Sequence, residues 1–147
     1  MMQLVSPIDI EDALRIDLTT LYESLSIDEV TFSAPPVEPT LGELPATGVI
    51  VCFRRVGGTR DDLVVDTHAV SVDVYAATWA EAIDEANRLA GVIAQLPYQA
   101  TTRIRYQAVE ISTAPYELPD TSNPVMPRVR MLINLIVKAA VEELQTQ

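Results

Sequence analysis

The chain has 147 residues, of which 48% are hydrophobic, and its 21 acidic and 10 basic residues give a formal charge of −11. That length suits one domain and that apolar content can build a core, so a wholly disordered chain is excluded. The single cysteine and single histidine exclude an intramolecular disulfide, a thiolate metal cluster and a site that needs two imidazoles. The single lysine argues against a surface that grips nucleic-acid phosphates.

The N-terminal part of the chain predicts a helix over 7–25. Its apolar residues recur every three or four positions, and Ser6-Pro7 supplies a start signal. The opening segment lacks a basic run followed by an apolar core, so we expect no secretory signal. A short extended piece over 30–33 follows, and the prolines of 35–47 then predict a long loop.

The middle of the chain predicts a hairpin and a second helix. The two strands, 48–56 and 63–76, are joined by a turn rich in glycine and aspartate. The second helix begins at Thr78, where Glu81 completes a capping-box pattern, and Pro97 ends it.

The C-terminal part predicts two further strands, 103–113 and 127–138, separated by a second proline-rich loop over 114–127. In the tail, 139–147, we expect a short helical turn. No apolar stretch reaches the roughly 20 residues that span a bilayer, so we expect a protein of the cytoplasm without membrane association. Helices that alternate with antiparallel strand pairs predict an α+β fold, with a mixed, mostly antiparallel sheet, two main helices packed against it and one domain over 1–147.

The sequence offers little for catalysis. Cys52 and His68 fall on adjoining strands of the predicted hairpin, where a nucleophile–base pair is conceivable. No catalytic signature surrounds either residue, and a cysteine on an apolar strand is most often a small core residue. Gly57-Gly58 lacks the lysine and the following helix of a phosphate loop, and we interpret Asp84 and Glu85 as a solvated helix face. The sequence therefore predicts no catalytic, metal or cofactor site and no enzyme.

Arginines occur in pairs within strand-like runs: Arg54/Arg55, Arg103/Arg105 and Arg128/Arg130. The spacing of two in the latter pairs places both members on one sheet face. Two interpretations stay open, namely ion pairs with neighbouring carboxylates or a stripe that binds a partner. The two proline-rich loops are likewise either surface loops packed on their own domain or segments that become ordered on a partner.

The order of five segments along the chain carries a family resemblance. They are PIDIEDALRIDLTTLYES, VTFSAPPVEP, TGVIVCFRRVGG, HAVSVDVYAATWAEAIDEANRLAGVIAQLP and PDTSNPVMPRVRMLINLIVKA. The run from an alternating valine strand through YAATWAEA into a small-residue helix is the most characteristic. With these segments the chain resembles, over nearly its whole length, the tail terminator (tail completion) proteins of long-tailed bacteriophages and the neighbouring head–tail connector proteins.

The resemblance implies an α/β sheet with flanking helices and a structural protein of the virion. Terminators of this kind cap the tail tube as a ring, usually a hexamer, and offer the docking face for the filled head. The implied partners are further copies of the chain, the tail tube protein and the head–tail connector proteins. DNA would only pass through, because a negative inner wall repels DNA instead of gripping it.

Residue roles follow from the resemblance as hypotheses. We expect Asp61, Asp62 and Asp66, which lack the spacing of a calcium loop, to face the lumen. We expect the arginines and both proline-rich loops to contact neighbouring subunits or the tube. The residues expected there are Leu41, Leu44, Arg54, Tyr116, Leu118, Val125, Met126, Arg128 and Arg130.

Three other function classes stay open. A head-completion or connector protein of the same fold would bind the portal side, and no residue separates it from a terminator. A small enzyme would need a titratable group with a shifted pKa in a cleft, for which Cys52 and His68 are the natural candidates. A generic protein-binding module unrelated to phages is the third.

Overall fold

Helices and strands alternate along the chain. The computed structural model describes residues 2–6, 9–33, 48–60, 65–99, 104–118, 127–138 and 140–144. In chain order these residues form β1 (Met2–Ser6), α1 (Ile10–Ser24), β2 (Val30–Ser33), β3 (Val49–Arg60), β4 (Val65–Tyr75), α2 (Trp79–Ala94), a 3₁₀ turn (Leu96–Tyr98), β5 (Tyr106–Glu117), β6 (Arg128–Lys138) and β7 (Ala140–Leu144).

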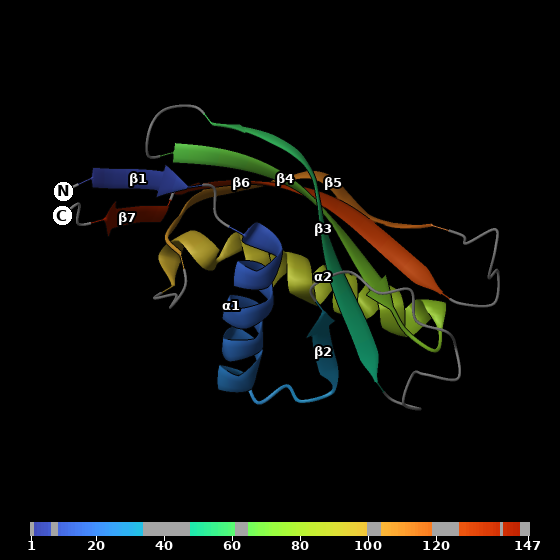
Figure 1. Ribbon diagram of the computed structural model, residues 1–147. Coiled ribbons are helices and arrows are strands. Elements are labelled where there is room, and N and C mark those ends of the chain that lie inside the picture. The colour runs from blue at the N-terminus through green and yellow to red at the C-terminus, as the bar shows by residue number, and fades with distance from the viewer. Residues whose placement is uncertain are drawn as a thin grey trace.

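A five-stranded sheet in the order β2-β3-β4-β6-β5 forms the centre of the fold. β2 lies parallel to β3, and the other neighbouring pairs are antiparallel. Both helices lie on one face of this sheet (Figure 1). The predicted α+β fold, with a mixed, mostly antiparallel sheet and two packed helices, is therefore confirmed.

The core lies between the helices and the sheet face that they cover. The alternation of β4 buries Val70, Val72 and Val74 on that face, with Met131 of β6 opposite Val72. α1 contributes apolar side chains at four-residue spacing, and α2 contributes small residues that let it approach the sheet. The buried helix residues are Ile10, Leu14, Leu18, Tyr22, Ala82, Ala86, Leu89 and Ile93. Each of the larger aliphatic side chains stabilises the fold by about 1.5–3 kcal/mol through burial.

Two predicted local features are confirmed. The N–H of Glu81 donates to Thr78 Oγ1 at 3.2 Å, so Thr78 caps α2 as the capping-box pattern predicts. β3 and β4 form the predicted hairpin, with Val51 opposite Val74.

The start of the first helix differs from the prediction. α1 begins at Ile10, and its cap is Asp9, whose Oδ1 accepts a hydrogen bond from the Asp12 N–H at 3.2 Å. Ser6, the predicted cap, ends β1, a strand that the local pattern did not reveal.

The C-terminal elements also differ from the prediction. β5 continues through Pro115 to Glu117, because an edge strand tolerates a residue without an N–H. The tail is extended instead of helical: β7 pairs antiparallel with β1 in a separate two-stranded sheet, with Val5 opposite Val141. This pairing joins the two ends of the chain (Figure 1), so periodicity within either segment could not predict it.

Candidate functional site

The face of the five-stranded sheet that turns away from α1 and α2 is the candidate interaction surface, and we call it the helix-free face. Its side chains alternate with those of the core, as Arg54 on β3, Asp73 on β4 and Arg130 on β6 illustrate. No helix in the described part of the chain packs on it (Figure 1). A sheet face that no described helix covers is a candidate surface for contact with another protein.

An ion pair lies at the centre of the helix-free face. Asp73 and Arg130 are directly opposite in the ladder between β4 and β6. Arg130 Nε donates to Asp73 Oδ1 at 2.7 Å, and a terminal nitrogen of Arg130 donates to Oδ2 at 3.0 Å. These hydrogen bonds raise the pKa of Arg130 above its ordinary value. For Arg130 the interpretation of the arginine pairs as partners of neighbouring carboxylates is therefore confirmed.

A second group of contacts continues this surface toward β5. Arg128 lies opposite Tyr75, and its Nε donates to the Leu118 carbonyl at 3.5 Å. The Leu118 N–H donates in turn to the Arg128 carbonyl at 2.8 Å. Burial raises the pKa of the Tyr75 hydroxyl, and a hydrogen bond with Arg128 opposes that rise. Tyr116 lies opposite Arg130 across the ladder of β5 and β6. Four of the predicted contact residues, Tyr116, Leu118, Arg128 and Arg130, therefore lie together.

The other predicted contact and lumen residues fall in different places. Arg54 is exposed on β3, on the helix-free face. Asp66 is only 4% exposed, which does not fit the expectation that it faces a lumen, because its strand turns it toward the core side of the sheet. The remaining ones lie outside the described residues: Leu41, Leu44, Asp61, Asp62, Val125 and Met126.

The structure separates Cys52 from His68. Cys52 lies opposite Asp73, whereas His68 lies opposite Gly58, five residues away along β4. The alternation of the strands also places His68 on the core face and Cys52 on the helix-free face. The conceivable nucleophile–base pair is therefore not formed.

His68 instead belongs to a buried polar contact. Arg55 Nε donates to His68 Nδ1 at 2.8 Å, and the imidazole is only 2% exposed. Its Nε2 is buried without a hydrogen-bond partner in the described part of the chain. Burial lowers the pKa of His68, Arg55 lowers it further, and Asp66 partly opposes both. The imidazole is therefore neutral at pH 7 and accepts through Nδ1.

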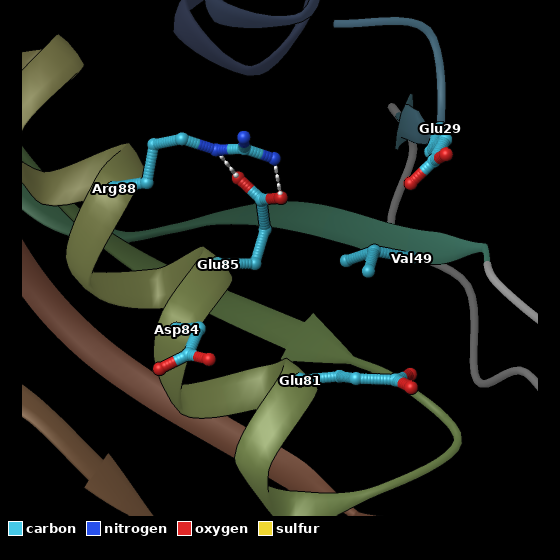
Figure 2. A pocket seen from close by; sticks show the side chains of 6 residues that line it. All are labelled: Glu29, Val49, Glu81, Asp84, Glu85 and Arg88. Carbon is cyan, nitrogen blue, oxygen red and sulfur yellow. Dashed lines mark hydrogen bonds and ion pairs between the residues drawn. The ribbon is translucent and has the colours of Figure 1, made fainter.

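An acidic hollow of about 470 Å³ opens beside the N-terminal half of α2 (Figure 2). Its polar lining residues are Glu29, Glu81, Asp84, Glu85 and Arg88. Figure 2 shows the Arg88 guanidinium against the Glu85 carboxylate, with Glu29 across the hollow from them.

Glu85 is buried, which corrects its assignment to a solvated helix face; Asp84 is exposed as expected. The Tyr22 hydroxyl of α1 donates to Glu85 Oε2 at 2.7 Å, and Arg88 Nε donates to the same oxygen at 2.9 Å. Burial and this carboxylate raise the pKa of Tyr22 far above its ordinary value. The i, i+3 spacing of Glu85 and Arg88 is the sequence signal that could have revealed the pair. Since Glu85 is fully partnered, the contact holds α1 to α2 and offers no reactive group.

A second buried contact holds α1 to the sheet. The Tyr106 hydroxyl of β5 donates to Asp17 Oδ2 at 2.9 Å, and both residues are only 2% exposed. Burial, and then Asp17, raises the pKa of Tyr106 strongly. Asp17 lies on the buried, otherwise apolar stripe of α1. That position was the only signal in the sequence that Asp17 makes a buried contact.

The described residues contain neither a cluster of metal ligands nor a helix that could span a membrane. Within them, histidine, cysteine and carboxylate side chains do not gather in a group of three that could hold a metal ion. Nor does any helix there have the length and apolarity needed to cross a membrane.

The fold has a counterpart among solved structures. No family model matches the chain. No curated protein is similar to it at a significant level. A chain of the structure described as "Virion of native gene transfer agent (GTA) particle" superimposes with a TM-score of 0.59 and 17% sequence identity, covering 88% of this chain and 98% of that one. The two chains share a fold over nearly their whole lengths.

Proposed function

We propose that this chain is a structural protein of a tailed, phage-like virion, and that it caps the tail tube as a ring which forms the joint to the head. The observation that carries the proposal is the fold shared with 98% of a chain from a virion particle. The order of sequence segments, which resembles tail terminators, supports the same role independently. Neither a metal-ligand group nor a Cys52–His68 pair is found among the described residues, so their arrangement favours assembly over catalysis.

The helix-free face supports an assembly role. Arg54, Arg128 and Arg130 lie on it, with Tyr116 opposite Arg130, and arginine and tyrosine are enriched at the centres of protein interfaces. We propose that these residues, and the segments around Leu41, Leu44, Val125 and Met126, contact neighbouring subunits or the tube.

The charge of the chain suits a passage for DNA. Each copy adds a formal charge of −11, so a ring of about six copies is strongly negative. DNA that leaves the head would be repelled from such a wall and would slide through it. We propose that Asp61 and Asp62 contribute to this wall; the buried Asp66 is left out of it.

Light scattering coupled to size exclusion tests the proposal. The full chain is run over a range of protein and salt concentrations, alone and with the tail tube protein of the same genome. We expect a ring of about six copies, or a ring that forms once tube protein is present. A monomer under every condition that also fails to co-elute with tube protein would contradict the proposal, and co-elution with the portal-side protein instead would favour a connector.

A further inference from the structure

Val56 is a large apolar side chain that the fold leaves in solvent. It is 57% exposed and lies at a register shift of β3, where Arg55 pairs with Val70 and Gly57 pairs with Ala69. As the extra residue of this bulge, Val56 has no partner on β4. The bulge therefore presents a single apolar side chain on the surface.

A small apolar hollow opens elsewhere on the molecule, between the C-terminal turns of α1 and α2. Its volume is about 140 Å³. Leu21, Leu25 and Val92 form its apolar part, and Ser24, Gln95 and Gln99 form its polar part. Leu25 itself is 55% exposed. The hollow is several times the roughly 30 Å³ that one water occupies, so it has room for a branched aliphatic side chain.

The charges around the two features are complementary. Both helices end at the hollow, and neither has a basic residue in its last turn to offset the negative end of the helix dipole. Glu23, exposed in the last turn of α1, adds a further negative charge. Arg54, by contrast, is exposed two residues before Val56. The hollow therefore suits an apolar side chain that has a positively charged side chain beside it.

We propose that Val56 of one copy docks in the hollow of a second copy, with Arg54 beside the C-terminal ends of the two helices. In Figure 1 the later part of β3 runs along the sheet away from the C-terminal end of α1, so the two features suit contact between copies better than contact within one. A cyclic ring needs two different surfaces on each copy that fit one another. The inference rests on the proposed ring and names both of its surfaces.

Disulfide trapping of the full chain tests the contact. The protein carries Val56→Cys and Gln99→Cys, both at exposed positions, in a Cys52→Ala background that removes the natural thiol. When this variant is oxidised together with tube protein, we expect a ladder of covalent oligomers that ends at the closed ring. The matched control replaces Gln99→Cys with Ala80→Cys, at an exposed position in the first turn of α2, at the opposite end of that helix from the hollow, and is expected to give no ladder.

The outcomes separate this inference from the proposed function. Rings that bind tube protein without a ladder overturn the docking of Val56 and leave the proposed function intact. A ladder in a protein that does not bind tube protein supports the docking and overturns the tube-capping role. The absence of both assembly and ladder overturns both.

A substitution series gives a second readout. Val56→Asp places a carboxylate in the apolar hollow and beside its negative rim, so we expect at least a tenfold rise in the protein concentration needed for assembly. Val56→Ile is expected to assemble as the wild type does. Equal assembly of Val56→Asp and wild type, with the fold intact by circular dichroism, would overturn the inference.

Discussion

Asp73 of β4 and Arg130 of β6 lie directly opposite each other and join through two hydrogen bonds, of 2.7 and 3.0 Å, on the sheet face that no described helix covers. The Asp73 side chain is 14% exposed and that of Arg130 is 30% exposed. A two-point contact of this kind, largely withdrawn from water, fixes the position of both side chains better than an ordinary surface ion pair does. It therefore presents Arg130 in a defined geometry to any partner of this face.

Replacing Arg130 by alanine should destabilise the protein by about 1–2 kcal/mol, because Asp73 loses its partner at a site with little access to water. Urea unfolding followed by circular dichroism measures the change. Asp73→Ala and the double variant complete a thermodynamic cycle, which isolates the coupling between the two residues. A coupling indistinguishable from zero would show that the pair contributes no stability.

Replacing Tyr106 by phenylalanine should cost about 1–3 kcal/mol, since the buried Asp17 carboxylate loses the hydroxyl donor at 2.9 Å while the ring volume is kept. Tyr98→Phe is the matched control, because Tyr98 is 80% exposed and its change should leave the free energy of unfolding within about 0.5 kcal/mol. Equal effects of the two variants would contradict the role given to the Tyr106–Asp17 contact.

The parts of the fold that depend on local pattern could be predicted from the sequence. The alternation of Val70, Val72 and Val74 indicated a half-buried strand, and the spacing of Thr78 and Glu81 indicated the start of α2. Each of these signals lies within a few residues of the feature that it specifies. The fold class followed because the elements alternate in chain order.

Features that depend on distant pairing could not be predicted. The pairing of β1 with β7 places Val5 opposite Val141, and the local sequence of neither segment indicates which strand it pairs with. The burial of Glu85 depends on Tyr22 of another helix, and the separation of Cys52 from His68 depends on the register of β3 and β4. From the local sequence, Glu85 was expected to be solvated, and Cys52 and His68 were conceivable neighbours. Tertiary packing and strand register produced the opposite arrangement.

Two glycines should respond in opposite ways to alanine. Gly58 has φ +145°, and a Cβ there would lie 2.2 Å from the Thr67 carbonyl oxygen, so Gly58→Ala should destabilise the protein by about 2–4 kcal/mol. Gly91 lies in α2, and a Cβ there meets nothing within 4 Å. Gly91→Ala should therefore stabilise by about 0.5–1 kcal/mol through helix propensity. Thermal or urea unfolding compares the two, and a loss of stability in both would contradict the open position of Gly91.

The buried histidine predicts an acid-sensitive stability. Burial and Arg55 hold the folded-state pKa of His68 below its ordinary value of 6.5, so the unfolded chain takes up the proton first as the pH falls. The contribution of the neutral imidazole to stability is therefore complete above about pH 6.5 and is lost as the pH falls from there toward the folded-state pKa. Within that window the loss should approach about 1.4 kcal/mol for each pH unit.

Urea unfolding at a series of pH values between about 5.5 and 7.5 measures this slope. The matched variant is His68→Gln, which keeps an oxygen able to accept from Arg55 Nε and cannot titrate. Because His68 is the only histidine of the chain, the difference between the two stability profiles reports on this one imidazole. A protonated Nδ1 would turn a donor toward the Arg55 donor, so the wild type should lose stability toward acid faster than the variant does. Parallel profiles would mean that His68 takes up its proton as readily in the folded protein as in the unfolded one, which its 2% exposure and its contact with a guanidinium argue against.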